Sequence, residues 1–505
     1  MLCLLLCGLS SIFFYSPLLD VQKIQYILIS SLCILCGKES VYKLLAIFLA
    51  LCLFLVCELF YHPMVLLIAQ SLLIFFVFWQ NKSNSEALTF LILAISFIFH
   101  LYYVQFSDVD HRQHDLNGVI YYIHQITKNG INWHNFNPWN MYYFFHQPLH
   151  FITAGYFYFL ELNLWSSTTV AQEGLQYLSL FYVTATTLIA SAILRLIKLP
   201  CSVYYSALML FAFNPTLFLF SGYIADDTPV LFWSVLFIYF ILYWILSDYS
   251  KYLVYAAFCL GIGTLTKLSI LTLTPAVCIL FFYKLYLSTQ KKKTLTALSF
   301  FVIIAVPLSL LWIIRNHILF DMPFYNIPDT SPGGQNFRNL TFGERITDFS
   351  SLFSPFINSP YIVEANIWLA LIKTELFGEW NLSLNHSIIR GPAFILYFLN
   401  VFFKFCATLW GAILIFSSFR ARINFSQAII NSFAVCYFII WGYAFKYAIN
   451  YPFACSTDYR LFIALMVPEI ILLATLAYQT STAKIFTFIS IIYSILTCFI
   501  YTTIV

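Results

Sequence analysis

Carboxylate and imidazole side chains gather in one stretch of the chain, residues 106–150. Seven of the ten histidines fall between residues 100 and 150, and Asp108, Asp110 and Asp115 lie within eight positions of one another. These two types of side chain exchange protons near neutral pH. Their concentration predicts a site of proton transfer in this stretch.

The rest of the chain is strongly apolar. Hydrophobic residues make up 61% of it, charged residues only 9%, and the mean hydropathy is +0.85. Continuous apolar runs approach the roughly 20 residues that a helix needs to cross a bilayer. We therefore predict an all-α, polytopic membrane protein surrounded by membrane lipids, and we exclude a soluble one. The net charge of +4 gives no reason to expect a nucleic acid partner.

The apolar runs predict about fifteen membrane spans, within a range of about 12 to 15. The runs lie at 2–18, 23–37, 42–60, 63–80, 87–105, 170–197, 202–221, 228–247, 252–266, 268–288, 295–317, 392–417, 425–448, 459–479 and 484–503. Between them remain two large segments that do not span the membrane, 106–169 and 318–391.

Alternating these spans across a membrane places most of the basic loop residues on one face. They are Lys38, Lys43, Lys82, Arg195, Lys198, Lys251, Lys284, Lys291, Lys292, Lys293, Arg420, Arg422 and Lys484. Loops rich in lysine and arginine stay in the cytoplasm, so this face is expected to be cytoplasmic. The opposite face then carries four polar segments, 106–169, 225–227, 318–391 and 456–460. We predict a composite, extracytoplasmic site there.

Part of the first loop, residues 106–169, has the pattern of a surface helix. Val119, Ile120, Ile123 and Ile126 recur at helical spacing between polar residues. This pattern favours an amphipathic helix that lies at the membrane interface.

Short polar motifs mark the ends of the predicted spans between residues 87 and 480. They are QHD at 113–115, FFHQPLHF at 144–151, SGYIADD at 221–227, LTKLS at 265–269, LWIIRNHILFDMPF at 311–324, KTELFGEW at 373–380 and STDYR at 456–460. In this order they resemble segments of the lipid-dependent glycosyltransferases of the GT-C superfamily. The protein O-mannosyltransferase and aminoarabinose transferase branch, which is similar to glycosyltransferase family 39, is the nearest match.

The resemblance implies a GT-C type catalytic membrane domain over 87–480, preceded by additional transmembrane helices at 1–86 and followed by a transmembrane helix at 481–505. It implies inverting transfer of a monosaccharide, a hexose or a pentose, from a polyprenyl-phosphate carrier. The acceptor would be a glycan, a lipid or a protein hydroxyl on the extracytoplasmic side. The resemblance also favours the bacterial inner membrane, with the endoplasmic reticulum membrane as the alternative.

Such a transfer needs one carboxylate to take the acceptor proton while the bond to the sugar forms. Asp115 is the first candidate for this base, because it matches the family position through QHD. Asp110 is the second candidate and Asp108 the third. The alternative is that Asp115 only caps a helix that begins near Leu116. His114 is a candidate for tuning the base or contacting the acceptor.

The departing lipid phosphate calls for cations, and the sugar for hydrogen-bonding groups. The candidate phosphate contacts are Lys267, Arg315, Lys373 and Arg460. Interfacial snorkelling is the alternative for Arg315 and Lys373. Asp226 and Asp227 are expected to bind sugar hydroxyls or to organise the first loop, while helix capping by Asp227 is the alternative.

The histidines raise the question of a metal ion. His111 and His114, or His146 and His150, could each bring two imidazoles to one ion if the segment is helical. Neither pair has a third ligand at motif spacing, so we predict no metal site and no certain cofactor, and a divalent ion stays an alternative. His146 and His150 are instead candidates for contacting the substrate.

Two other classes of membrane protein remain open. A transporter or lipid flippase should show repeated halves or helices broken in corresponding positions. A glycan ligase, or an oligosaccharyltransferase, would use a lipid-linked donor but transfer a preassembled glycan. The sequence lacks the WWDYG-type motif of the oligosaccharyltransferases.

Overall fold

The computed structural model describes Ser71 and residues 86–505, apart from residues 111, 114, 133, 325–336, 338, 358–363, 383–385 and 419–424. The four spans predicted between residues 2 and 80 lie outside the described residues. So do His111 and the candidate substrate contact His114.

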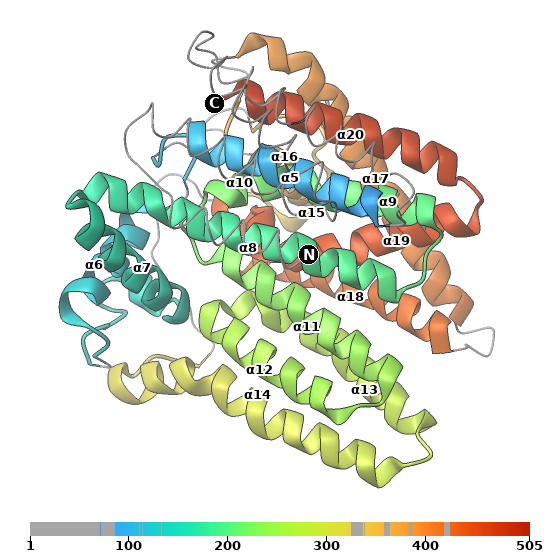
Figure 1. Cartoon of the computed structure of the whole chain (residues 1–505), viewed down its shortest axis with the longest axis horizontal. Coiled ribbons are helices and arrows are strands. Elements are labelled where there is room, and N and C mark those ends of the chain that lie inside the picture. Colours follow the sequence, from blue (N-terminus) through green and yellow to red (C-terminus); the bar gives the residue numbers. More distant parts are fainter. Residues whose placement is uncertain are drawn as a thin grey trace, which may run out of the picture.

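The described residues form helices joined by short turns and two longer segments (Figure 1). In chain order, with η for a 3-10 helix, they are α5 (Ala87–Phe106), α6 (Leu116–Asn129), η1 (Tyr142–Phe145), α7 (Leu149–Trp165), α8 (Thr168–Leu196), α9 (Cys201–Ala212), α10 (Pro215–Gly222), α11 (Asp227–Ser247), α12 (Ser250–Thr266), η2 (Leu268–Leu273), α13 (Thr274–Leu287), α14 (Lys291–Phe320), α15 (Phe342–Thr347), α16 (Ile367–Phe377), η3 (Ser387–Ile389), α17 (Arg390–Ser418), α18 (Phe425–Asn450), η4 (Ala454–Thr457), η5 (Tyr459–Leu465), α19 (Met466–Gln479) and α20 (Ala483–Thr503).

The prediction of an all-α membrane protein is confirmed. Nine helical segments of the described residues are long and apolar enough to cross a membrane, or ten if the bent pair of α9 and α10 counts as one span. No strand occurs in the part of the chain that the structure describes. The predicted span 252–266 corresponds to α12, which at 17 residues falls just below the length of the other spans.

The predicted span 202–221 is two helices rather than one. The chain bends by 41° between α9 and α10. Pro215 occupies the first turn of α10, and the Asn214 side chain accepts a hydrogen bond from the backbone N–H of Thr216. Asparagine before proline is a start signal for a new helix, which explains the break.

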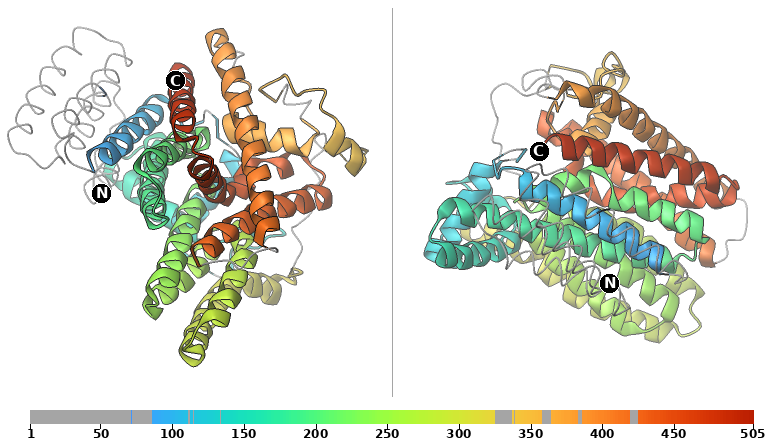
Figure 2. Two further views of the ribbon diagram at one scale, coloured as in Figure 1. Left: turned by 90° about the vertical axis from the view of Figure 1, so that its right-hand side faces the viewer. Right: turned by 45° about the horizontal axis from the view of Figure 1, so that its top comes forward.

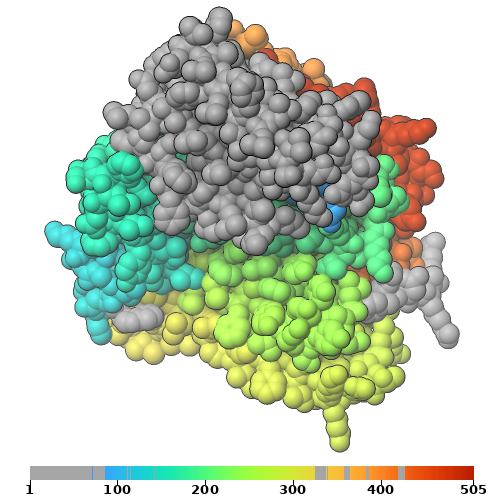
Figure 3. Space-filling view, in the orientation of Figure 1, coloured from blue at the N-terminus to red at the C-terminus, as the bar shows by residue number. Residues whose placement is uncertain are grey.

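The helices lie side by side and run between two ends of the molecule, as Figure 1 and the right view of Figure 2 both show. The turns between α8 and α9, α13 and α14, and α19 and α20 gather at one end, which we call the basic end. Several basic residues lie in or beside these turns, namely Arg195, Lys198, Lys284, Lys291, Lys292, Lys293 and Lys484. Helices α6 and α7 form the opposite end (Figure 3).

The amphipathic helix predicted in the first loop is present as α6. Its apolar face, including Val119 and Ile123, is buried, and the helix packs against α7. The Tyr122 ring stacks on Phe151 of α7 at a centroid distance of 4.2 Å. A small apolar core therefore fixes the first loop on the end of the bundle.

Gly118 allows η1 to approach α6 closely. A Cβ atom at this position would come within 1.8 Å of the Tyr143 ring. Tyr143 in turn stacks on the His146 ring at 5.8 Å. The absence of a side chain at Gly118 thus leaves room for the Tyr143 ring, on which His146 stacks.

One ion cluster lies inside the bundle, and we call it the core triad: Glu375, Lys404 and Glu469. The Lys404 ammonium lies 2.7 Å from Glu375 Oε2 and also pairs with Glu469. Asn400 donates a hydrogen bond to Glu375 Oε2 at 2.9 Å. All of these side chains are buried. Lys404 is near the middle of α17, so the triad is far from either end of that helix.

Candidate functional site

The first loop is attached to the segment between α10 and α11 by Gln113. Its side-chain amide donates to the Gly222 carbonyl at 2.5 Å and accepts from the Ile224 N–H at 3.1 Å. His150 contacts the Ile224 carbonyl through Nε2 at 2.6 Å. These bonds bring the loop that carries Asp115 to the segment that carries Asp226.

Asp115 occupies the N-cap position of α6 in a left-handed conformation, with φ of 54°. Its side chain makes no capping hydrogen bond, although its backbone carbonyl accepts from Gly118 and Val119. The carboxylate instead lies 3.7 Å from the Arg460 guanidinium, and its side chain is 51% exposed. The alternative that the Asp115 side chain serves as a helix cap is therefore wrong.

Asp226 and Asp227 share the buried ammonium of Lys267. The Lys267 Nζ atom lies 2.9 Å from Asp226 Oδ1 and 2.5 Å from Asp227 Oδ1. Neither aspartate side chain makes a capping bond at the start of α11, so their carboxylates are held by charge. Lys267 reaches them because α12 ends at Thr266 and Lys267 is in an extended conformation.

The ion pair between Asp226 and Lys267 opposes the effect of burial on the pKa of each of these two groups. Burial by itself would raise the pKa of Asp226, but Lys267 and then His146 lower that pKa overall. Burial would lower the pKa of Lys267, but Asp226 and Asp227 raise it overall. Both groups are therefore charged at neutral pH.

Arg460 connects this pair to Asp115. Its guanidinium lies 3.4 Å from Asp227 Oδ2 and 3.0 Å from Asp458 Oδ2. Asp458 also accepts a hydrogen bond from the backbone N–H of Arg460, which fixes the start of η5. We call the resulting group the end cluster: Asp115, Asp226, Asp227, Lys267, Asp458 and Arg460.

The two histidines of the HQPLH segment have different surroundings. His146 lies with Nδ1 3.3 Å from Asp226 Oδ2, and its side chain is 24% exposed. His150 is buried, and burial lowers the pKa of its imidazole. His146 thus borders the end cluster, while the neutral His150 supports the backbone of the segment before α11.

The remaining candidates lie apart from the end cluster. Arg315 donates to the Phe136 carbonyl at 2.7 Å and lies over the Trp312 ring, so it holds the first loop. Lys373 is buried and pairs with Glu364 at 2.5 Å. Asp110 is exposed. The structure therefore brings together Asp115, His146, Asp226, Asp227, Lys267 and Arg460 from the predicted set, and leaves Arg315 and Lys373 elsewhere.

Two residues of the site were not among the sequence candidates. Gln113 is the first residue of QHD and Asp458 the third of STDYR. Gln113 is next to His114 and Asp458 is two residues before Arg460, each within a quoted motif, and that position was the only available signal. Glu379, in KTELFGEW, adds negative charge near Arg460.

The end cluster holds more acid than base. Four carboxylates face two cations, Lys267 and Arg460. Buried charges are costly unless they are paired, so both cations are engaged with the protein's own carboxylates. The partly exposed Asp115 is the member that an incoming hydroxyl group can reach.

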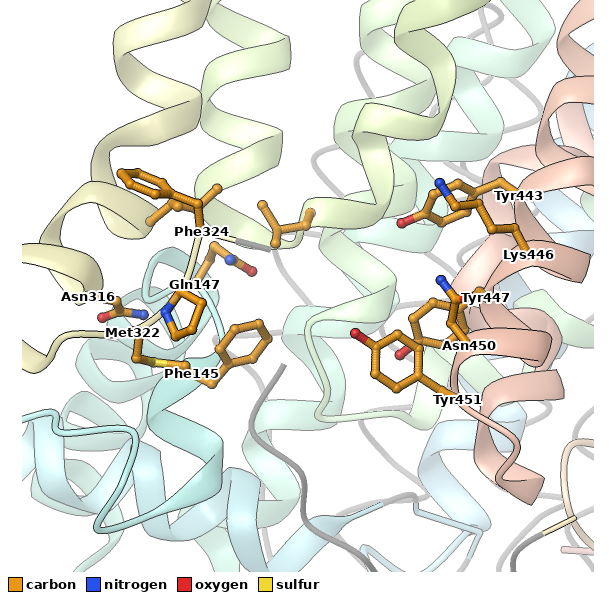
Figure 4. Close-up of a pocket in the computed structure, with 13 residues that line it drawn as sticks. Phe145, Gln147, Asn316, Met322, Phe324, Tyr443, Lys446, Tyr447, Asn450 and Tyr451 are labelled. Carbon is orange, nitrogen blue, oxygen red and sulfur yellow. The ribbon is translucent and has the colours of Figure 1, made fainter. Parts of the chain in front are cut away.

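A cavity of about 640 Å³ lies between the end of α14 and the end of α18 (Figure 4). Phe145 and Gln147, which flank His146, line it together with Leu268, which follows Lys267. The cavity wall thus includes residues directly next to His146 and Lys267 in the chain. In the part of the chain that the structure describes, no group of three histidine, cysteine or acidic residues is arranged to hold a metal ion.

No family model and no curated protein matches this sequence. The fold is similar to that of an oligosaccharyltransferase from Archaeoglobus fulgidus, whose crystal structure is described as a complex with Zn and sulfate. The likeness covers 82% of this chain and 52% of the other, with 14% sequence identity and a TM-score of 0.47. The present chain thus spans about half the length of that protein.

Proposed function

We propose that this protein is an inverting glycosyltransferase. It would transfer a hexose or a pentose from a polyprenyl-phosphate carrier to a hydroxyl group of a glycan, lipid or protein acceptor. The reaction would take place at the end of the molecule opposite the basic end, which the positive-inside rule makes extracytoplasmic.

In this reaction the acceptor oxygen attacks the anomeric carbon of the sugar. The Asp115 carboxylate takes the hydroxyl proton as the new bond to carbon forms. The bond between that carbon and the phosphate oxygen breaks, and the polyprenyl phosphate leaves with the bonding electrons. One base is enough because a phosphate ester leaves readily without protonation, and attack opposite the leaving group inverts the anomeric configuration.

The observation that carries the proposal is the contact between Asp115 and Arg460. An exposed carboxylate is held at the edge of a buried charge network by a residue far away in the sequence. Ionisable side chains buried inside a membrane protein, as Asp227 and Lys267 are, are costly and usually mark a functional site. The ordered motifs that resemble GT-C enzymes give this carboxylate its role.

A transporter is the less favoured function. It should have helices broken in corresponding positions of two halves. In the described residues one pair is bent, α9 and α10, and a proline with a capping asparagine explains that bend.

The test is transfer of labelled sugar from a panel of defined polyprenyl-phosphate hexoses and pentoses by the purified full chain. Wild type should consume at least one donor. Asp115→Asn should lower turnover by about 100-fold or more, which is the usual contribution of a catalytic base, and Asp110→Asn should not. If no donor is consumed, the proposed function is wrong. If Asp110→Asn alone is inactive, the base is Asp110.

A further inference from the structure

We propose that the cavity between α14 and α18 binds the phosphosugar headgroup of the lipid donor, with Lys446 as its phosphate contact. This inference rests on the proposed function for the identity of the ligand. It differs from the sequence-based prediction, in which the candidate phosphate contacts were Lys267, Arg315, Lys373 and Arg460, of which Lys267 and Arg460 lie in the end cluster.

The charges of the end cluster argue against those two residues. Lys267 lies within 3 Å of two carboxylates, and Arg460 within 4 Å of three. Because these carboxylates outnumber the cations, the net charge of the end cluster is negative. A phosphate placed against it would be repelled unless a further cation intervened.

Lys446 is such a cation. It lines the cavity from α18, is exposed, and makes no ion pair with any carboxylate among the described residues. It also lies within a candidate membrane span, Gln427–Asn450, near the end that faces the end cluster. A lysine near a helix end can also snorkel to the membrane interface, but Lys446 lines a cavity, where its ammonium can bind an anionic ligand.

The rest of the lining suits a sugar. Tyr443, Tyr447 and Tyr451 follow one another at intervals of four residues, so they share one face of the α18 end. Figure 4 shows their hydroxyl groups directed across the cavity toward the wall that carries Gln147 and Asn316. Aromatic rings pack on the apolar faces of sugars, while hydroxyl and amide groups bond their edges.

The size and position of the cavity agree with this ligand. Its volume of about 640 Å³ lies within the range of about 300–1,000 Å³ that is usual for small-molecule sites. Phe145, Gln147 and Leu268 form the side next to His146 and Lys267. A sugar held here would extend from the phosphate at Lys446 toward the end cluster.

The test measures binding of sugar-free polyprenyl phosphate to the full chain in nanodiscs of phosphatidylcholine, for example by native mass spectrometry. Lys446→Gln should weaken binding about tenfold or more, because it removes a charge-assisted hydrogen bond, and Lys446→Arg should retain most of the affinity. Lys128→Gln is the matched control, since Lys128 is an exposed lysine at the same end. Unchanged affinity of Lys446→Gln overturns the proposal.

A second comparison tests the sugar part of the site and the source of the phosphate. Tyr447→Leu should weaken binding of the glycosylated donor more than that of bare polyprenyl phosphate. Phosphatidylglycerol should compete poorly with polyprenyl phosphate for the wild-type protein. Equal competition, or an equal effect of Tyr447→Leu on both ligands, would show that the cavity is not a donor site.

These measurements separate the inference from the proposed function. If the wild type binds polyprenyl phosphate through Lys446 but transfers no sugar, the proposed binding site is supported and the proposed function is wrong. If the wild type transfers sugar and Lys446→Gln has the same KM for the donor, the proposed function is supported and the proposed binding site is wrong.

Discussion

The end cluster and the core triad both contain more carboxylates than cations, but they differ in where their residues come from. The members of the end cluster lie in loops, at helix ends and in a 3-10 helix, and Asp115 reaches solvent. The members of the core triad lie within helices α16, α17 and α19, and all are buried. In the described part of the chain, residues next to His146 and Lys267 line a cavity of about 640 Å³, and no residue of the core triad lines it.

This difference separates two uses of buried charge. A closed triad can hold helices together, but no substrate reaches it. A cluster with an exposed carboxylate can act on a ligand, although its charge near solvent is unbalanced. We therefore expect changes in the end cluster to abolish activity, and changes in the core triad to reduce stability first.

The largest effect is expected from Arg460→Gln. This change leaves Asp115, Asp227 and Asp458 without their shared cation, so activity should fall by about 100- to 1,000-fold. Stability should fall by about 3–5 kcal/mol, as is usual when one partner of a buried ion pair is removed. Donor turnover and thermal unfolding in detergent measure the two effects.

The matched control for this change is Arg195→Gln. Arg195 pairs with Glu86 at the basic end, and both side chains are partly exposed. Such a pair contributes about 0–1 kcal/mol, and activity should not change. Equal losses in the two variants would mean that the end cluster has no special role.

Lys404→Met should have the next largest effect, and it should act on stability. Two buried carboxylates, Glu375 and Glu469, would remain without a cation, and the loss should be about 3–5 kcal/mol. The triple variant with Glu375→Gln and Glu469→Gln should recover most of this loss. Thermal unfolding of the wild type, Lys404→Met and the triple variant measures the loss and the recovery of stability. The triple variant should also retain donor turnover. A triple variant that is stable but inactive would contradict the separation between the two clusters.

A smaller effect is expected from Gln113→Ala. The Gly222 carbonyl and Ile224 N–H would lose their partners in the first loop, at a cost of about 1–3 kcal/mol. Because the loop positions Asp115, turnover should fall more than donor binding. Gln125→Ala is the control, since the Gln125 side chain accepts a hydrogen bond from Asn129 on the surface of α6, within one helix. The interpretation of Gln113 fails if both variants keep full turnover.

The smallest effect is a pH dependence of stability through His150. Burial lowers the pKa of this imidazole below its ordinary value of 6.5, although Asp226 and the Ile224 carbonyl oppose the shift. Below pH 6.5 the unfolded chain therefore takes up a proton that the folded protein does not, and stability falls as the pH falls. The loss should be about 1 kcal/mol by pH 5.5.

His150→Gln keeps a donor for the Ile224 carbonyl and removes the titration. The unfolding temperature should therefore fall less steeply in this variant than in the wild type when the pH is lowered from 7.5 to 5.5. Asp226 and Lys267 do not titrate in this window, because their pKa values are shifted away from it. If the unfolding temperature depends on pH in the same way in both proteins, His150 does not change its protonation on unfolding.

The sequence predicted the helices because hydrophobic runs and helical periodicity are local signals. It also predicted that Asp115, Asp227 and Arg460 share one face, since alternation of spans follows from counting them. The break between α9 and α10 was missed, although asparagine and proline at 214–215 are a known start signal.

The partners of the charged residues could not be predicted. Lys267 and Arg315 both interrupt apolar runs, yet one meets two carboxylates and the other a backbone carbonyl and an aromatic ring. Lys373 pairs with Glu364 in the preceding loop. Which acid a lysine meets depends on how helices rotate against each other, and that is decided by packing of side chains far apart in the chain.

The most direct test of the central claim is a single-turnover measurement with saturating labelled donor and acceptor. Donor affinity of Asp115→Asn should equal that of the wild type, while the rate of sugar transfer should fall by about 100-fold or more. Asp248→Asn is the control, because Asp248 also has a left-handed backbone and an exposed carboxylate but lies at the basic end of α11. An unchanged rate of transfer in Asp115→Asn would contradict the assignment of the base and with it the role of the end cluster.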